Sequence, residues 1–105
     1  MSKCKITVLK RTLHEDLVEA YKSKEAIEQT GAGLCPLFEE GQEFIVDSPW
    51  TAPESFCPWA WADFRQFVLS FFLGNEPPSS NPLDVFIACC TDGFRPVIFK
   101  LERSE

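Results

Sequence analysis

Cys57 is the residue of this chain whose position best suits chemistry. It precedes Pro58, and proline fits the first position of a helix because its missing N–H needs no partner there. A thiol at this cap lies near the positive end of the helix dipole, which favours the thiolate form. Cys57 is therefore the leading candidate for a nucleophile or a metal ligand. Simple packing beside Phe56 and the nearby indoles is the structural alternative.

A second group of candidates lies near the end of the chain. Asp92 could orient a substrate or accept a proton, and Arg95 could hold an anionic group through a forked contact. Cys90 and Asp63 complete the catalytic candidates. Each has a structural alternative, since Asp92 is also typical of a hairpin turn and Arg95 could simply pair with it. Asp63 could lie at a solvated edge of its helix.

Aromatic side chains near these groups could wall an apolar pocket. The candidates are Trp50, Trp59, Trp61 and Phe94. Trp50 falls in a loop with two prolines, where it could instead pack as a lid on the core. A pocket of this kind could hold a hydrophobic metabolite, and exposed aromatic residues could form a protein interface.

The cysteines also allow a metal site. Cys35, Cys57 and Cys89 supply three thiols, and soft ligands of this kind favour zinc, copper(I) or iron. Consecutive residues of a strand point to opposite faces, so Cys89 and Cys90 could share one ion only at a bulge or a strand end. The chain has no Cys-x-x-Cys pair, and its odd number of cysteines, five, argues against a disulfide framework.

Composition places the chain among small globular proteins. Its 105 residues suffice for one domain spanning 1–105, and 45% hydrophobic residues, including ten Phe, exclude a disordered chain. The formal charge of −6 argues against nucleic acid or an anionic membrane as the main partner. No apolar run reaches the length of about 18 residues that a membrane span needs. The beginning of the chain lacks the apolar region of a signal peptide, so a cytoplasmic location is expected.

The hydrophobic pattern predicts two helices and up to five extended segments. The helices are expected at residues 12–30 and 57–73, and the extended segments at 3–10, 34–38, 43–47, 83–90 and 95–103. Residues 83–90 are nearly all apolar, as in a central strand covered on both faces. The order predicts an α+β fold with two layers, a mostly antiparallel sheet of four to five strands with two helices on one face.

The helix at 57–73 has more apolar surface than one sheet face can bury. Only Asp63, Arg65, Gln66 and Ser70 interrupt its apolar sequence. A partner subunit could cover the remainder, so a homo-oligomer is expected.

Three motifs together resemble a known family. They are Cys-Pro at residues 35–36, Phe-Cys-Pro-Trp-Ala-Trp-Ala-Asp at 56–63, and Cys-Cys-Thr-Asp-Gly-Phe-Arg-Pro-Val at 89–97. In combination they are similar to an uncharacterised family of short, cysteine-containing microbial and fungal proteins, over nearly the whole chain. The resemblance supplies no activity to transfer, but it favours a functional site where these motifs meet.

Three functions are compatible with these residues. The favoured one is an enzyme that acts on a small molecule with a thiol and carboxylate site of Cys57, Asp92 and Arg95. One alternative is a non-catalytic binding or interaction module for a hydrophobic ligand or a protein partner. The other is a thiolate metal-binding protein. We expect the functional centre to lie where the helix start at Cys57, the Cys35-Pro36 segment and the turn from Cys89 to Arg95 converge.

Overall fold

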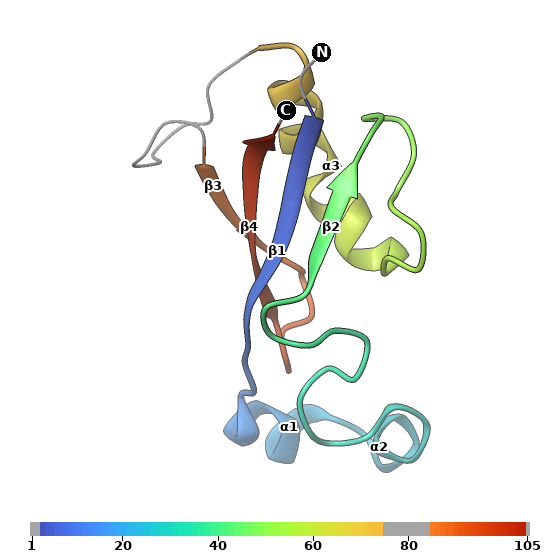
Figure 1. Cartoon of the computed structure of the whole chain (residues 1–105). Coiled ribbons are helices and arrows are strands. Elements are labelled where there is room, and N and C mark those ends of the chain that lie inside the picture. Colours follow the sequence, from blue (N-terminus) through green and yellow to red (C-terminus); the bar gives the residue numbers. More distant parts are fainter. Residues whose placement is uncertain (1–2, 75–84, 105) are drawn as a thin grey trace.

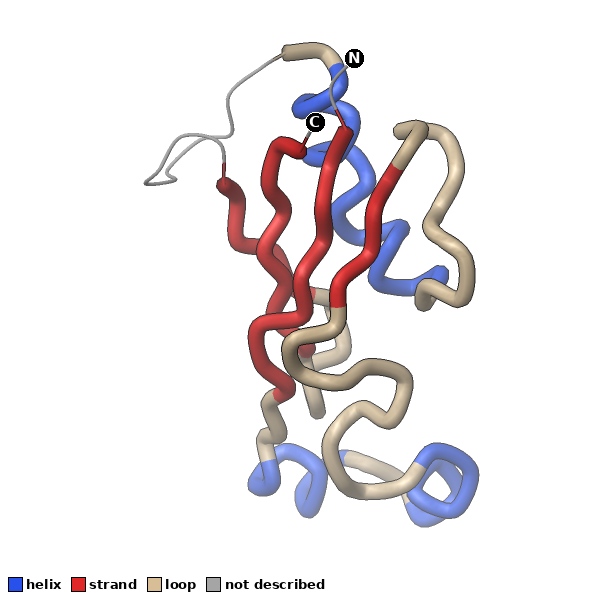
Figure 2. The backbone as a smooth tube through the Cα atoms, in the orientation of Figure 1, coloured by secondary structure: helices blue, strands red, loops and turns tan. Residues whose placement is uncertain are grey.

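The computed structural model describes residues 3–74 and 85–104 of the chain (Figure 1). Its elements are β1 (Lys3–Arg11), α1 (Glu15–Tyr21), α2 (Lys24–Thr30), β2 (Glu43–Val46), α3 (Pro58–Phe72), β3 (Val85–Cys89) and β4 (Val97–Ser104). The strands form one sheet (Figure 2) in the order β2-β1-β4-β3, and every neighbouring pair is antiparallel. The predicted α+β class and antiparallel sheet are confirmed.

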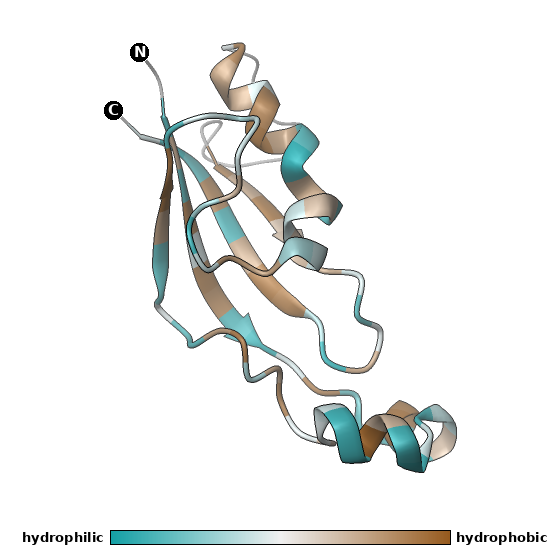
Figure 3. Ribbon diagram, turned by 90° about the vertical axis from the view of Figure 1, so that its right-hand side faces the viewer, coloured by the Kyte–Doolittle hydropathy of each residue, from teal (hydrophilic) through white to brown (hydrophobic). Residues whose placement is uncertain are grey.

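Helix α3 lies across one face of the sheet and supplies most of the second layer (Figure 3). It begins where the sequence predicts, with Cys57 as an extended cap and Pro58 at the first helical position. Its buried residues are spaced three or four apart, so they form a single stripe. The core combines that stripe, Ala60, Phe64, Val68 and Phe71, with the inward-facing residues Cys4, Ile6, Val8, Val97, Phe99 and Leu101 of the two central strands.

The centre of this core is a cluster of phenylalanine rings. Phe56, just before α3, packs edge-on or tilted against Phe38, Phe64 and Phe99, with ring centroids 5.1 to 5.9 Å apart. Its contact with Phe44 of β2 is closer still, at 4.9 Å. Such pairs contribute about 0.5–1.5 kcal/mol each beyond the burial of their area. The rings therefore fix how the loops before β2 and α3 enter the core.

The first predicted helix is two short helices, which lie beyond one end of the sheet (Figures 1 and 3). Lys22 is extended, and the side chain of Ser23 accepts a hydrogen bond of 3.1 Å from the Ala26 amide to cap α2. The N-terminal cap of α1 is His14, two residues after the expected start of the helix, and the Thr12 hydroxyl donates a hydrogen bond to the Pro96 carbonyl. Of the described helices, only α3 contacts the strands across a face of the sheet.

Two further expectations differ from the structure. Residues 34–38 form a loop of turns and bends and not a strand. The apolar segment predicted as a central strand forms β3 at the edge of the sheet, with residues 83–84 outside the described part of the chain. Within that part, no helix is long and apolar enough to cross a membrane.

Cys4 gives a measurable test of the core. It is fully buried on β1, and this desolvation raises the pKa of its thiol from an ordinary 9.0 to about 12. At a pH between 9 and about 12, the Cys4 thiol is deprotonated in the unfolded chain but stays protonated in the folded chain. The free energy of unfolding should therefore fall as the pH rises above 9, by about 1.4 kcal/mol per unit relative to Cys4→Ala. Urea unfolding of both proteins at several pH values measures this difference, and parallel pH profiles would contradict it.

Candidate functional site

A pocket of about 210 Å³ opens at the end of the sheet nearest α2, where the start of α3 meets the segment that leads into β4. Three segments that are distant in sequence line it, at residues 30–38, 57–60 and 90–97. The lining residues are Thr30, Cys35, Leu37, Phe38, Cys57, Trp59, Ala60, Cys90, Asp92, Arg95 and Val97. The segments that carry the three sequence motifs thus share one pocket, and most of its wall is apolar.

Cys57 reaches the pocket because of how the chain enters α3. Ser55 adopts a left-handed backbone with φ of 65°, and the Phe56 amide donates to the Pro53 carbonyl at 3.1 Å. This turn directs Phe56 into the core and leaves Cys57 half-buried at the helix start. The Cys57 side chain makes no capping hydrogen bond, so its thiol remains available to the pocket.

Asp63 connects α3 to the segment between β3 and β4. Its Oδ2 accepts the Thr91 amide at 2.7 Å, and both carboxylate oxygens lie 3.1 Å from the Thr91 hydroxyl. The same hydroxyl accepts the indole N–H of Trp59 at 2.6 Å. Trp59 and Asp63 are four residues apart and therefore on one side of the helix. Asp63 does not line the pocket, and its contacts hold Trp59 and residues 90–97 in place around it.

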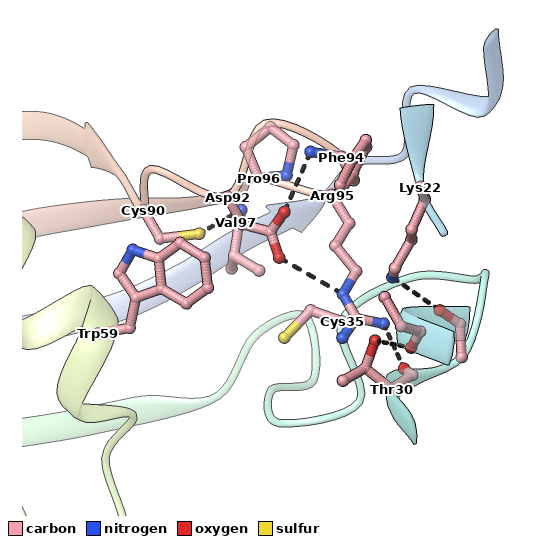
Figure 4. A network of polar contacts seen from close by, with 12 residues as sticks. Lys22, Thr30, Cys35, Trp59, Cys90, Asp92, Phe94, Arg95, Pro96 and Val97 are labelled. Carbon is pink, nitrogen blue, oxygen red and sulfur yellow. Dashed lines mark hydrogen bonds and ion pairs between the residues drawn. The ribbon is translucent and has the colours of Figure 1, made fainter. Parts of the chain in front are cut away.

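Asp92 and Arg95 form the charged part of the pocket wall (Figure 4). One oxygen of Asp92 accepts the Phe94 amide at 3.0 Å, and the other lies 3.6 Å from Arg95 Nε. Arg95 Nη1 donates to the carbonyls of Thr30 at 2.8 Å and Gly33 at 3.5 Å. The arginine thus joins the end of α2 to the sheet, and its side chain is only 11% exposed. This network explains why both residues are placed firmly, and it occupies much of their hydrogen-bonding capacity.

Three of the five cysteines line the pocket, namely Cys35, Cys57 and Cys90. The Cys90 sulfur also accepts the Val97 amide at 3.4 Å. Cys89 is exposed, because neighbouring strand residues alternate between the two faces of the sheet. The structure therefore does not bring together the expected metal ligands Cys35, Cys57 and Cys89. Among the described residues, no three His, Cys, Asp or Glu side chains are arranged to hold a metal ion.

Of the four aromatic candidates, only Trp59 lines the pocket. Trp61 packs on the core beside Phe56, with ring centroids 6.4 Å apart, and Trp50 is 69% exposed in its loop. Phe94 lies outside the pocket lining, and its ring centroid is 5.6 Å from the Lys22 Nζ. Sequence reasoning did not single out five of the lining residues, which are Thr30, Leu37, Phe38, Ala60 and Val97. Ala60 and Val97 lie within the sequence motifs, whereas Thr30, Leu37 and Phe38 join the pocket through the tertiary fold.

Comparison of the chain with protein-family models, curated proteins and solved structures finds no match. The resemblance to a family of short cysteine-containing proteins therefore stays a prediction.

Replacing Asp63 tests its role as a connector. Asp63→Ala removes the acceptor for the Thr91 amide and hydroxyl, and we expect a loss of about 1–2 kcal/mol in the free energy of unfolding. Asp47→Ala is the matched control, since Asp47 makes an exposed ion pair with Lys3 at 3.1 Å and should contribute less than about 0.5 kcal/mol. Urea unfolding measures both variants. Equal losses would show that the contact with Thr91 does not stabilise the fold.

Proposed function

We propose that the pocket binds a small, largely apolar molecule. The observation that carries this proposal is the pocket itself, a hollow of about 210 Å³ whose wall is mostly side-chain carbon and sulfur. Pockets of this character, with few polar groups, are typical of small-molecule sites. A cavity of about 150 Å³ accommodates benzene, so this one suits a ligand of about six to ten non-hydrogen atoms.

The rim of the pocket supports the same proposal. Leu37 and Trp59 both line it, although 62% and 53% of their surfaces are exposed. Exposed apolar side chains at the mouth of a pocket gain contact area when an apolar ligand binds. Asp92 and Arg95 supply charge to one side of the pocket, but they pair with each other at 3.6 Å, so the apolar residues provide most of the surface open to a ligand.

A thiol-based enzyme is the second candidate, favoured by the position of Cys57 at the start of α3 inside this pocket. Neither of the two predicted carboxylates is free to act as a base, since Asp92 is engaged by Phe94 and Arg95 and Asp63 is engaged by Thr91. If Cys57 is activated, it should alkylate much faster than the exposed Cys89 at a pH where ordinary thiols are protonated. Equal or slower alkylation would leave binding as the function.

The expected cytoplasmic location agrees with this proposal. All five cysteines are free, and a reducing compartment would keep the three pocket thiols reduced.

Binding can be measured by calorimetry with indole as the probe. Leu37→Ala should raise the dissociation constant roughly fivefold, because about 1 kcal/mol of apolar contact is lost. The matched control is Leu73→Ala, since Leu73 is 68% exposed at the end of α3 and does not line the pocket. It should leave the dissociation constant unchanged. An absence of indole binding, or equal effects of the two variants, would contradict the proposal.

A further inference from the structure

Strand β3 has the sequence of an interior strand but lies at an edge of the sheet. Its residues, Val-Phe-Ile-Ala-Cys, include no charge, proline or glycine. Nearly continuous apolar runs are typical of strands with neighbours on both sides and cover on both faces. Within the described residues β3 pairs only with β4, which leaves its other side without a partner strand. Sequence and position disagree at this edge.

The opposite edge of the sheet shows how this protein protects an exposed strand. β2 is only four residues long, begins at Glu43 and is followed by Asp47. Both carboxylates pair with lysines of β1, Asp47 with Lys3 at 3.1 Å and Glu43 with Lys5 at 3.5 Å. Short length and flanking charges are common devices against unwanted strand pairing. β3 has no charged residue within its bounds, although Asp84 precedes it in the sequence as Asp47 follows β2. The two edges therefore differ in the charge carried on the strand itself, Glu43 of β2.

Apolar side chains remain accessible on both sides of β3. On the helix side, the ring of Phe86 stacks on Phe67 of α3 with centroids 4.1 Å apart, and both rings are only half-buried. On the open face of the sheet, Ile87 is 52% exposed. A strand added beside β3 would cover parts of both surfaces. The added strand would lie beside Phe67 of α3, the helix whose sequence has more apolar surface than one sheet face can bury.

We propose that β3 pairs with β3 of a second copy of this chain, which joins the two sheets into one continuous sheet. Identical strands related by a two-fold axis run antiparallel, and a two-fold axis at Ile87 sets Phe86 opposite Ala88 of the other copy. The small alanine leaves room for the phenylalanine ring. This match of a large side chain with a small one supports a second copy as the partner. Each chain carries a formal charge of −6, so two copies repel one another, and a contact between them has to form where charge is least. The uncharged β3 edge is where that repulsion is weakest.

Two isoleucines at opposite edges provide the test. Ile87→Lys places a charge in the proposed interface. Ile45→Lys places the same charge on β2, at a residue with a similar exposure of 47%. Light scattering after size-exclusion chromatography should show dimers for the wild type and Ile45→Lys, and monomers for Ile87→Lys. Cys89→Lys is a second variant. Cys89 is also exposed on β3, so a lysine at this position should dissociate the dimer as well.

Each alternative gives a different result. A monomeric wild type at about 100 μM, a concentration far above the dissociation constant of a stable dimer, would overturn the proposal. If both isoleucine variants are monomeric, the copies stack through the open faces of their sheets and not through β3. If Ile87→Lys and Cys89→Lys both stay dimeric with native circular dichroism, the interface lies elsewhere. In the proposed dimer, amide exchange in residues 85–89 slows as the protein concentration rises.

Discussion

The packing of α3 on the two central strands is the constraint on which the rest of the structure depends. Phe64 and Phe99 meet at the centre of this interface, with ring centroids 5.1 Å apart, and Phe56 closes it at the start of the helix. Because Phe56 is fixed in the core, the next residue, Cys57, is fixed at its surface. The pocket lies where the aromatic core ends, since Phe38, Ala60 and Val97 belong both to the core and to the pocket wall.

Polar contacts join the three segments of the pocket to one another and to the sheet. Asp63 of α3 accepts a hydrogen bond from the Thr91 amide, and Arg95 donates one to the Thr30 carbonyl at the end of α2. Arg11 adds a contact to the Cys35 carbonyl at 3.3 Å, which holds the third segment of the pocket. Most of these contacts join a side chain to backbone groups, so they position whole segments. Asp63 and Arg95 therefore serve the candidate site chiefly by building it.

Local signals predicted the elements well, while the placement of the elements required the structure. The start of α3 follows from Pro58, and the alternation of β1 and β4 follows from their apolar residues. The break between α1 and α2 depends on the Ser23 cap, which a helical pattern conceals. Arg95 pairs with Asp92, as the structural alternative from the sequence had it. The other partners, a threonine for Asp63 and backbone carbonyls for Arg95, are distant in sequence, and such contacts have no sequence signature. Alternation in a strand correctly separated Cys89 from Cys90, but it did not indicate which of them would join Cys35 and Cys57.

The most direct test of the pocket uses all five cysteines as reporters. Alkylation of each thiol by iodoacetamide is followed by mass spectrometry, with and without saturating indole. A single pocket predicts that indole slows Cys35, Cys57 and Cys90 together, leaves the exposed Cys89 unchanged, and finds the buried Cys4 unreactive in both cases. Bound indole that leaves the three pocket thiols unprotected, or that protects Cys89 instead, would contradict the account.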